Sequence, residues 1–335
     1  LVADEVGLGK TMVARGVIAR IIEMLQHTVP RLDIVYICSN GAIARQNVAK
    51  LDVLDGGEAK VLPTRLTLLA LELMRAGGIR KTGVNFFSLT PGTSLYLTSG
   101  GGTKEERALI RRMIWPMVTQ RRAVTALFQG YASKKGWRNT RARMKSQPVE
   151  PSIEARFRQA LAHKPDLIAE LEATALAFRG GGRHDSALRR RRDRLIGALR
   201  GLLAEVSAAA LEPDLIILDE FQRFQDLLKD QSAAAALARL LFDHKDDAGN
   251  EARTLLLSAT PYRILSLADD DAEAGDHYTE FMEVIEFLYG PERGPYVRET
   301  LEAEMRRFRR AILRLPEAEQ EAMACKHGIE RDLRG

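Results

Sequence analysis

Residues 3–11 have the composition of a loop that wraps phosphate groups, Ala-Asp-Glu-Val-Gly-Leu-Gly-Lys-Thr. Gly7 and Gly9 have no Cβ atom, so the backbone there can turn tightly and direct its N–H groups at anionic oxygens. Lys10 would reach the β- and γ-phosphates of a nucleoside triphosphate, and the hydroxyl of Thr11 would ligate Mg²⁺. The sequence therefore predicts a triphosphate site near its first residues. The alternative is a glycine-rich turn before an amphipathic helix.

One position departs from the strict phosphate-loop pattern G-x-x-x-x-G-K-[ST]. Asp4 stands where that pattern has its first glycine. A helix follows the loop, because apolar residues recur at helical spacing from Val13 to about His27, and Pro30 ends it. The positive end of this helix would add to the attraction for phosphate.

An acidic pair supplies the carboxylates that triphosphate hydrolysis requires. Asp219 and Glu220 directly follow the unbroken apolar run 215–218, which predicts a buried strand. At the end of that strand, Asp219 could hold Mg²⁺ and Glu220 could act as a general base on water. An acidic pair alone usually marks a solvated turn. In a chain with a phosphate loop, and after an apolar strand, we interpret this pair as catalytic.

Alternating strands and helices must position these residues. Residues 34–38, 84–89 and 254–257 read as further strands, and residues 42–54 as a helix after the first of them. This order predicts an α/β fold, a parallel sheet flanked by helices. Ligands of such sheets lie beyond the carboxyl ends of the strands.

Three motifs together resemble superfamily 2 helicases and translocases. Residues 3–11, 219–222 (Asp-Glu-Phe-Gln) and 258–261 (Ser-Ala-Thr-Pro) are similar to motifs I, II and III of that superfamily. The first motif is most similar to Swi/Snf-like proteins and related bacterial DEAD/DEAH-type helicases, in which a DEGLGKT-like loop replaces the first glycine. Asp4 is therefore expected there. The resemblance implies a RecA-like P-loop NTPase lobe that binds ATP and Mg²⁺ and depends on nucleic acid, with DNA favoured over RNA.

The resemblance also implies roles for single residues. The loop would bind ATP through Asp4, Glu5, Val6, Gly7, Leu8, Gly9, Lys10 and Thr11. The catalytic residues would be Lys10, Asp219, Glu220 and Gln222. Thr11 and Asp219 would hold the Mg²⁺. Gln222 stands where many members carry His; it can hydrogen-bond but cannot become cationic, so we expect its coupling role to persist.

Motif III and the ends of two other strands would serve nucleic acid. Coupling between nucleotide state and the nucleic-acid groove would use Ser258, Ala259 and Thr260. Contacts to backbone phosphates would come from Ser39, Asn40, Gln46 and Thr90, which position a strand without reading its sequence.

The segment 103–212 differs from the rest of the chain. It has 23 Lys and Arg against 11 Asp and Glu, an excess of 12 positive charges in a chain whose formal net charge is only +5. We expect long helices over 103–131, kinked at Pro116, over 152–178 and over 186–211. Thr103 and Glu106 have capping-box spacing. A basic helical insertion favours a polyanionic partner; a solvated helical surface is an equally good interpretation.

Two basic clusters within this segment are candidate nucleic-acid contacts. The first lies between the expected helices, where Trp137 is surrounded by Lys134, Lys135, Arg138 and Arg141. Basic residues beside an aromatic ring suit phosphate contact and base stacking. The second is Arg189–Arg192, whose four side chains would cover all sides of a helix, so only some can face one groove. The alternatives are solvated loops or contacts to another subunit.

These assignments divide the chain into three parts. We expect residues 1–102 and 213–290 to form the RecA-like ATP-binding lobe and residues 103–212 the insertion. Residues 291–335 would begin a helical linker to a second RecA-like lobe, whose arginine fingers complete the ATP site in this superfamily. Few strand residues precede the phosphate loop, so the chain looks like a fragment. We therefore expect it to bind ATP·Mg²⁺ weakly and to hydrolyse ATP poorly by itself.

Composition limits the remaining possibilities. Cys38 and Cys325 are the only cysteines, and their separation gives neither a disulfide framework nor metal-ligand spacing, which suits a cytoplasmic protein. No run approaches the roughly 18 apolar residues that span a bilayer, so we expect no membrane partner. Two rival functions stay open: a P-loop ATPase of another class, and a nucleic-acid-binding scaffold that uses ATP only as a switch.

Overall fold

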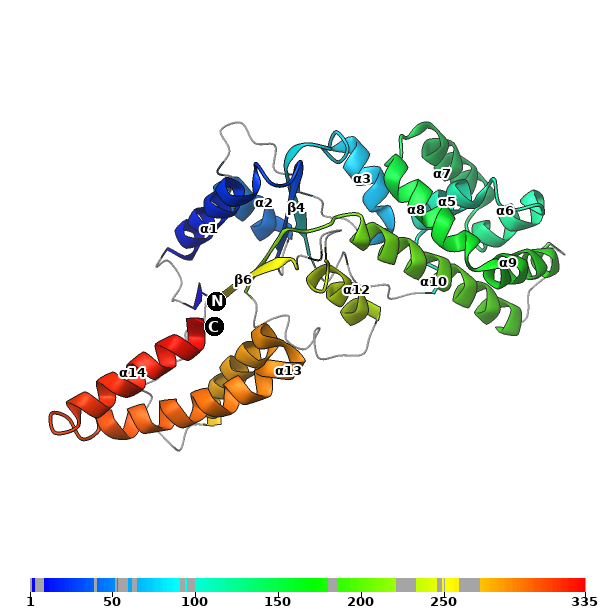
Figure 1. The fold of residues 1–335 in the computed structure, drawn as a ribbon. Helices are drawn as coiled ribbons and strands as arrows, with labels where there is room; N and C mark the ends of the chain where they lie inside the picture. The colour runs from blue at the N-terminus through cyan, green and yellow to red at the C-terminus, as the bar shows by residue number, and fades with distance from the viewer. Residues whose placement is uncertain are drawn as a thin grey trace. The chain divides into compact units, whose positions relative to one another are not determined.

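The computed structural model describes residues 2–3, 9–38, 41–51, 53, 60–61, 65–90, 94, 100–179, 186–220, 233–245, 249, 251–258 and 272–334. The chain divides into two compact units (Figure 1). The first contains residues 1–2 and 7–257, and the second contains residues 3–6 and 258–335.

A six-stranded sheet in the order β1–β6–β5–β2–β4–β3 forms the centre of the first unit. The strands are β1 (Val2–Ala3), β2 (Arg31–Ile37), β3 (Lys60–Val61), β4 (Gly83–Leu89), β5 (Leu215–Asp219) and β6 (Arg253–Ser258). Strand β2 pairs in parallel with β4 and β5, β6 with β5, and β3 with β4. The predicted parallel α/β sheet is therefore confirmed.

Two helices pack on the sheet, α1 (Lys10–Leu25) and α2 (Gly41–Leu51) (Figure 1). Ile18 of α1, Val48 of α2 and Ile217 of β5 belong to one buried apolar cluster. Burying an aliphatic side chain of this size stabilises the fold by about 2 kcal/mol. This cluster fixes the start of α1 against the sheet.

The predicted strands all form, with shifted ends, because each is an apolar run long enough to be buried on both faces. The helix predicted at 42–54 is α2. The apolar residues 61–74, which mix helical and strand patterns, contain the end of β3, a 3₁₀ turn η1 (Leu66–Leu68) and helix α3 (Leu69–Arg75). Helix α12 (Ala233–Phe242) lies between β5 and β6 in the chain.

The basic segment is helical, as predicted, but it contains more helices than expected. They are α5 (Lys104–Ile114), α6 (Arg121–Gln129), α7 (Lys134–Ser146), α8 (Pro151–Ala162), α9 (Pro165–Phe178) and α10 (Ser186–Ala209). Pro116 was expected to kink one helix; instead α5 ends before it, because proline has no N–H and clashes with the preceding turn. Likewise 152–178 is two helices, the second beginning at Pro165, a favoured first position.

The basic residues around Trp137, expected between helices, lie in helix α7. The Ser133 side chain caps this helix by accepting a hydrogen bond from the Gly136 N–H at 3.2 Å. Trp137, Thr140 and Met144 are buried, and their spacing of three and four residues defines one inward face of a helix. These residues were expected between helices because their many positive charges obscure the apolar face of α7 in the sequence.

The predicted capping box at the start of α5 is confirmed, and its glutamate has a larger role. Glu106 Oε2 accepts the Thr103 N–H at 2.6 Å. Oε1 accepts from Thr67 Oγ1 at 2.6 Å and from Arg200 Nη2 at 2.8 Å. Arg65 adds a contact to Oε2 at 3.2 Å. Glu106 therefore joins η1, in the connection between β3 and β4, to helices α5 and α10 of the insertion.

Both charges of the central pair are completely buried, since the side chains of Glu106 and Arg200 are each 0% exposed. Burial by itself would raise the pKa of Glu106, but the hydrogen bonds from Thr67 and Thr103 and the charge of Arg200 outweigh it and lower that pKa. Gly102 makes the close packing possible: a Cβ there would lie 2.5 Å from Arg200 Nε.

A second buried carboxylate lies near the amino end of β2. Asp33 is 1% exposed, accepts a hydrogen bond from Asn85 Nδ2 at 2.7 Å and forms an ion pair with Arg31. Its N–H donates to Asp214 Oδ2 at 2.7 Å. Burial raises the pKa of Asp33 to about 6, although Arg31 and Asn85 act to lower it.

Residues 272–334 of the second unit are mainly helical. Helix α13 (Ala272–Ile312) is broken at Gly290, whose backbone is not helical (φ 73°, ψ 175°). The apolar pattern predicts two separate helices here, over 276–288 and 299–315, and the break at Gly290 agrees with that prediction. Helix α14 (Glu319–Arg334) lies in the segment 291–335, which was expected to be helical. Met282 and Leu301 of α13 and Ile329 of α14 share one buried cluster. None of the described helices has the length and hydrophobicity that crossing a bilayer requires.

The substitution Glu106→Gln should destabilise the chain by about 3 to 5 kcal/mol, because it leaves the buried Arg200 cation without its counter-charge. Glu170→Gln is the matched control: Glu170 pairs with Arg191 at 3.3 Å, but the two side chains are 46% and 43% exposed. That exposed pair should contribute less than about 1 kcal/mol. Urea unfolding of both variants measures the difference, and equal losses would contradict the central role of Glu106.

The substitution Asp33→Asn should remove part of the pH dependence of stability. The folded pKa of Asp33 is raised from 3.8 to about 6, so between these values the folded state holds a proton that the unfolded state has lost. This contribution is present below pH 3.8 and is lost as the pH rises through 6. The loss is at most about 3 kcal/mol. Urea midpoints between pH 4 and 6.5 should fall more steeply in the wild type than in Asp33→Asn; parallel profiles would contradict this.

Candidate functional site

The first turn of α1 presents an uncapped positive end. Gly9, its N-cap, is left-handed (φ 102°, ψ 11°), and no side chain caps the helix. The Gly9 carbonyl accepts the N–H groups of Met12 and Val13 at 2.8 and 3.1 Å. No acidic residue lies in the first turn, so among the described residues no carboxylate there neutralises the helix dipole. This end of α1 can accept an anion.

Gly9 is required for its backbone conformation. A Cβ added at Gly9 would meet nothing within 4 Å, but its φ of +102° is one that L side chains rarely adopt. Any other residue would strain the turn by about 1 to 2 kcal/mol. Lys10 and Thr11, both half-buried, follow directly in the first turn of α1. The left-handed conformation of Gly9 therefore determines where helix α1 begins, with Lys10 and Thr11 in its first turn.

Asp219 lies at the carboxyl end of β5, where two side chains from other elements hold it. Tyr36 of β2 donates its hydroxyl to Asp219 Oδ2 at 2.5 Å. Asn47 of α2 donates from Nδ2 to the same oxygen at 3.0 Å and to the Tyr36 hydroxyl at 3.1 Å. The carboxylate is thereby fixed from one side.

This arrangement leaves the other oxygen available. Both donors use Oδ2, and no described residue donates to Oδ1. Burial, followed by the negative charge of Asp219, raises the pKa of Tyr36 above its ordinary range, so the phenol keeps its proton and remains a donor. Asp219 can therefore offer one carboxylate oxygen to a cation or to a cation-bound water.

Sequence reasoning missed Tyr36 and Asn47. Tyr36 lies inside an apolar strand, where an aromatic residue is expected only to pack. The strand register supplies the missing signal: Tyr36 pairs with Ile217, and Asp219 stands two residues further along β5. Alternate residues of a strand share a face, so Tyr36 and Asp219 are diagonal neighbours. Only a known β2–β5 register could have revealed this contact.

Glu220 follows Asp219 in an uncommon backbone conformation. Its φ is 57°, one of two positive values among the described non-glycine residues. A left-handed conformation costs a non-glycine residue about 1 to 2 kcal/mol, and such strain is concentrated at functional sites. The side chain is half-buried. This outlier, next to the fixed Asp219, supports the functional interpretation of the acidic pair.

The order of the sheet separates the two halves of the predicted site by one strand. Strand β6 lies between β1, which precedes the predicted phosphate loop, and β5. Neighbouring strands are about 4.8 Å apart, so β1 and β5 are separated by about 10 Å. Leu257 of β6 is the register partner of Asp219.

Many predicted site residues lie outside the described part of the chain. They are Asp4, Glu5, Val6, Gly7, Leu8, Ser39, Asn40, Gln222, Ala259 and Thr260. Their roles stay predictions.

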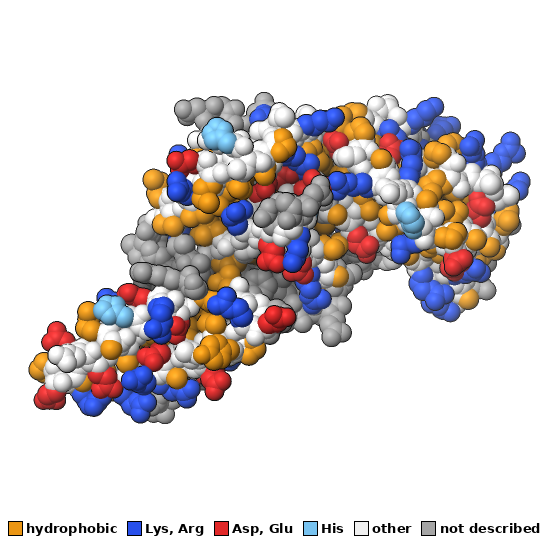
Figure 2. Space-filling model, in the orientation of Figure 1, with side chains coloured by type: hydrophobic (Ala, Val, Ile, Leu, Met, Phe, Trp, Pro, Cys, Tyr) orange, Lys and Arg blue, Asp and Glu red, His pale blue; other side chains and the backbone are white. Residues whose placement is uncertain are grey.

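The predicted nucleic-acid contacts are only partly on the surface. Lys134, Lys135 and Arg138 of α7 and Gln46 of α2 are exposed, and Arg141 is half-buried. Lys and Arg side chains gather over the helices of the insertion (Figure 2). Thr90 is buried, and its N–H donates to Ser94 Oγ at 3.2 Å.

Trp137 is 2% exposed, which corrects the expected stacking role. Its ring packs inside the helical insertion, so it presents no face to a base in this structure.

The described residues contain no group of three or more His, Cys, Asp or Glu side chains that could hold a metal. Mg²⁺ does not need one, because proteins commonly bind it through one or two carboxylates together with substrate phosphates. Asp219, with one oxygen open, and the Thr11 hydroxyl fit that mode of binding.

Comparison with known proteins gives no match. No family model matches the sequence, no curated protein is significantly similar to it, and no solved structure matches it. A function must therefore be argued from the residues and contacts of this chain.

The substitution Tyr36→Phe should destabilise the chain by about 1 to 2 kcal/mol, because it removes a hydrogen bond to a carboxylate without changing the packed volume. In an Asp219→Asn background the same change should cost less, with a coupling energy of about 1 kcal/mol. Tyr296→Phe is the control, since Tyr296 is 72% exposed. Urea unfolding tests this, and equal effects of the two Tyr→Phe changes would show that the Tyr36–Asp219 bond contributes nothing.

Proposed function

We propose that the chain is the ATP-binding lobe of a nucleic-acid-dependent ATPase of the superfamily 2 helicase and translocase type, with a RecA-like fold. The observation that carries the proposal is Asp219. It lies at the carboxyl end of a parallel strand, held through one oxygen by Tyr36 and Asn47. The uncapped start of α1, with Lys10 and Thr11, and the three motifs support the same proposal.

Each proposed role follows from chemistry available to the side chain. The first-turn N–H groups of α1 and Lys10 bind the phosphates of ATP. Thr11 and Asp219 would hold the Mg²⁺, and its charge would offset that of the phosphate oxygens during transfer. Glu220 accepts a proton from the water that attacks the γ-phosphate, giving ADP and phosphate. Tyr36 and Asn47 keep Asp219 oriented.

Dependence on nucleic acid is supported by the charge of the insertion and by the motif resemblance. Residues 103–212 carry an excess of 12 positive charges, while the rest of the chain is acidic, and basic surfaces attract the phosphate backbone. DNA is favoured over RNA. Ser258, Ala259 and Thr260 would couple nucleotide state to this binding, and a second RecA-like lobe would complete the ATP site.

Two substitutions should separate nucleotide binding from hydrolysis. Lys10→Ala should weaken ATP·Mg²⁺ binding by at least about tenfold, because it removes a charged phosphate contact. Glu220→Gln should keep binding but reduce nucleic-acid-stimulated turnover of the full-length protein by about 10²- to 10⁴-fold. Calorimetric ATP titration and a phosphate-release assay measure the two effects.

The controls are Lys50→Ala on α2 and Glu23→Gln on α1, both exposed residues. They should leave binding and turnover unchanged. If Lys10→Ala bound ATP as the wild type does, the proposed nucleotide site would be wrong. If Glu220→Gln hydrolysed ATP normally, its assignment as general base would be wrong.

A further inference from the structure

The four consecutive arginines 189–192 of α10 have different surroundings. Arg191 pairs with Glu170 at 3.3 Å. Arg192 is 4% exposed, and it donates to the Leu127 carbonyl at 2.9 Å and to Asp193 Oδ1 at 2.5 Å. The Arg189 guanidinium lies over the Tyr131 ring, 5.0 Å from its centre. Three of the four arginines are therefore engaged within the insertion.

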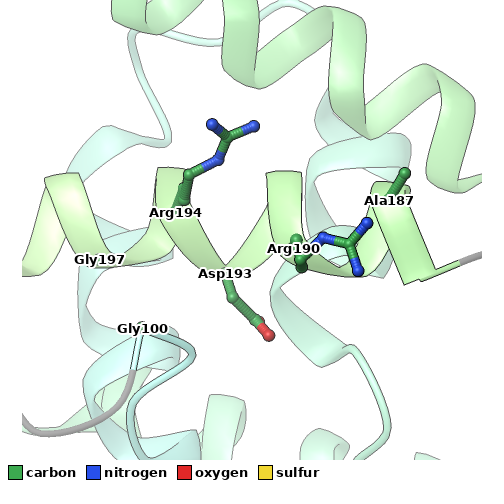
Figure 3. A pocket seen from close by; sticks show the side chains of 6 residues that line it. All are labelled: Gly100, Ala187, Arg190, Asp193, Arg194 and Gly197. Carbon is green, nitrogen blue, oxygen red and sulfur yellow. The ribbon is translucent and has the colours of Figure 1, made fainter.

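Arg190 differs from these three and shares a surface with Arg194, one helical turn further along α10. Both side chains are exposed, and no acidic side chain of the described residues pairs with either. They line a pocket of about 570 Å³, which we call the α10 pocket (Figure 3). Its described lining is Gly100, Ala187, Arg190, Asp193, Arg194 and Gly197.

Two glycines of the α10 pocket lie against each other, Gly197 within α10 and Gly100 outside it. A Cβ on Gly100 would lie 2.8 Å from the Asp193 carbonyl oxygen, so no other residue fits without displacing the helix. A Cβ on Gly197 would lie 3.5 Å from Gly100 Cα. Residues 100–102 are therefore packed tightly on α10, and this packing forms one side of the α10 pocket.

The electrostatic balance of the α10 pocket is positive. Asp193 is the only carboxylate in the described lining, and the buried Arg192 already neutralises it at 2.5 Å. Arg190 and Arg194 keep their charge without a described partner. Ala187 lies in the first turn of α10, which contains no acidic residue, so no carboxylate among the described residues of that turn opposes the positive end of the helix dipole.

We propose that the α10 pocket binds phosphodiester groups of nucleic acid. The Cα atoms of Arg190 and Arg194, four residues apart, are displaced along the helix by about 6 Å, and each guanidinium group can bind phosphate oxygens in a bidentate fork. The described lining has no aromatic or large apolar side chain to hold a base, so the contact is to backbone and independent of sequence. This inference rests on the proposed function in taking nucleic acid as the partner.

The test is binding of a labelled double-stranded DNA oligonucleotide to the whole chain, followed by fluorescence anisotropy at several salt concentrations without nucleotide. The variant is Arg190→Gln with Arg194→Gln. The matched control is Arg122→Gln with Arg179→Gln, which removes two exposed arginines of the insertion outside the pocket. The pocket variant should bind about tenfold more weakly at low salt, with the slope of log K against log salt reduced by about 2. The control should change both quantities much less.

A second variant, Ala187→Glu, guards against an effect of misfolding. A carboxylate in the first turn of α10 should maintain or raise thermal stability through the helix dipole, while it places negative charge in the pocket lining. Weaker DNA binding at an unchanged or higher melting temperature is therefore expected. Unchanged DNA binding by this variant would count against the α10 pocket.

Three results would overturn the inference. They are a pocket variant with the affinity and salt slope of the control, a wild-type chain that binds no DNA, and a pocket variant that loses affinity for ATP but keeps its affinity for DNA. The first leaves the proposed ATPase untouched, because ATP binding depends on Lys10 and is measured separately. Failure of this pocket and failure of the proposed function are thus distinguishable.

Discussion

The buried ion pair between Glu106 and Arg200 is the constraint on which the first unit depends. Neither side chain is exposed to water, so each charge is tolerable only in the presence of the other. Glu106 also accepts hydrogen bonds from Thr67 and Thr103, which belong to the sheet side and to the start of α5. The Glu106 carboxylate therefore connects three elements, η1, α5 and α10. The helical insertion is consequently joined, through a buried contact, to η1 in the connection between β3 and β4.

Hydrogen bonds from other elements also hold the carboxylate of Asp219, but they leave one of its oxygens available. Glu106 uses both oxygens for internal partners, and its pKa is lowered accordingly. Asp219 receives Tyr36 and Asn47 on one oxygen only, and it stands half-buried at a strand end. A carboxylate with one oxygen held by protein donors and the other available is preorganised for a ligand. A carboxylate with both oxygens bonded to protein groups serves the stability of the fold. This contrast is the physical reason to assign function to Asp219 and stability to Glu106.

The sequence was sufficient for features that depend on local patterns. Apolar runs predicted β2, β4, β5 and β6, and Thr103 with Glu106 predicted the capping box. The sequence was insufficient where the contacts of a side chain come from an element that is distant in the chain. The Tyr36–Asp219 contact requires the register of two strands separated by about 180 residues. The burial of Trp137 was hidden by the charges around it, although its spacing from Met144 fits a helix face. The functional assignment of the phosphate loop and of motif III stays a prediction.

Counting charges overstates the basic surface of the insertion, since several of its arginines are structural. Arg200 and Arg192 are buried, and burial lowers the pKa of Arg192. Burial, together with nearby Arg141, lowers the pKa of Arg111 to about 10, and its guanidinium lies 4.0 Å from the centre of the Trp115 ring. Such cations stabilise packing and have little capacity to attract a polyanion. What can attract one is the smaller set that is exposed and unpaired among the described residues. Arg190 and Arg194 belong to that set, and both line the α10 pocket. Net charge identifies a candidate polyanion-binding segment, but the burial and the partners of each arginine decide which of them can bind.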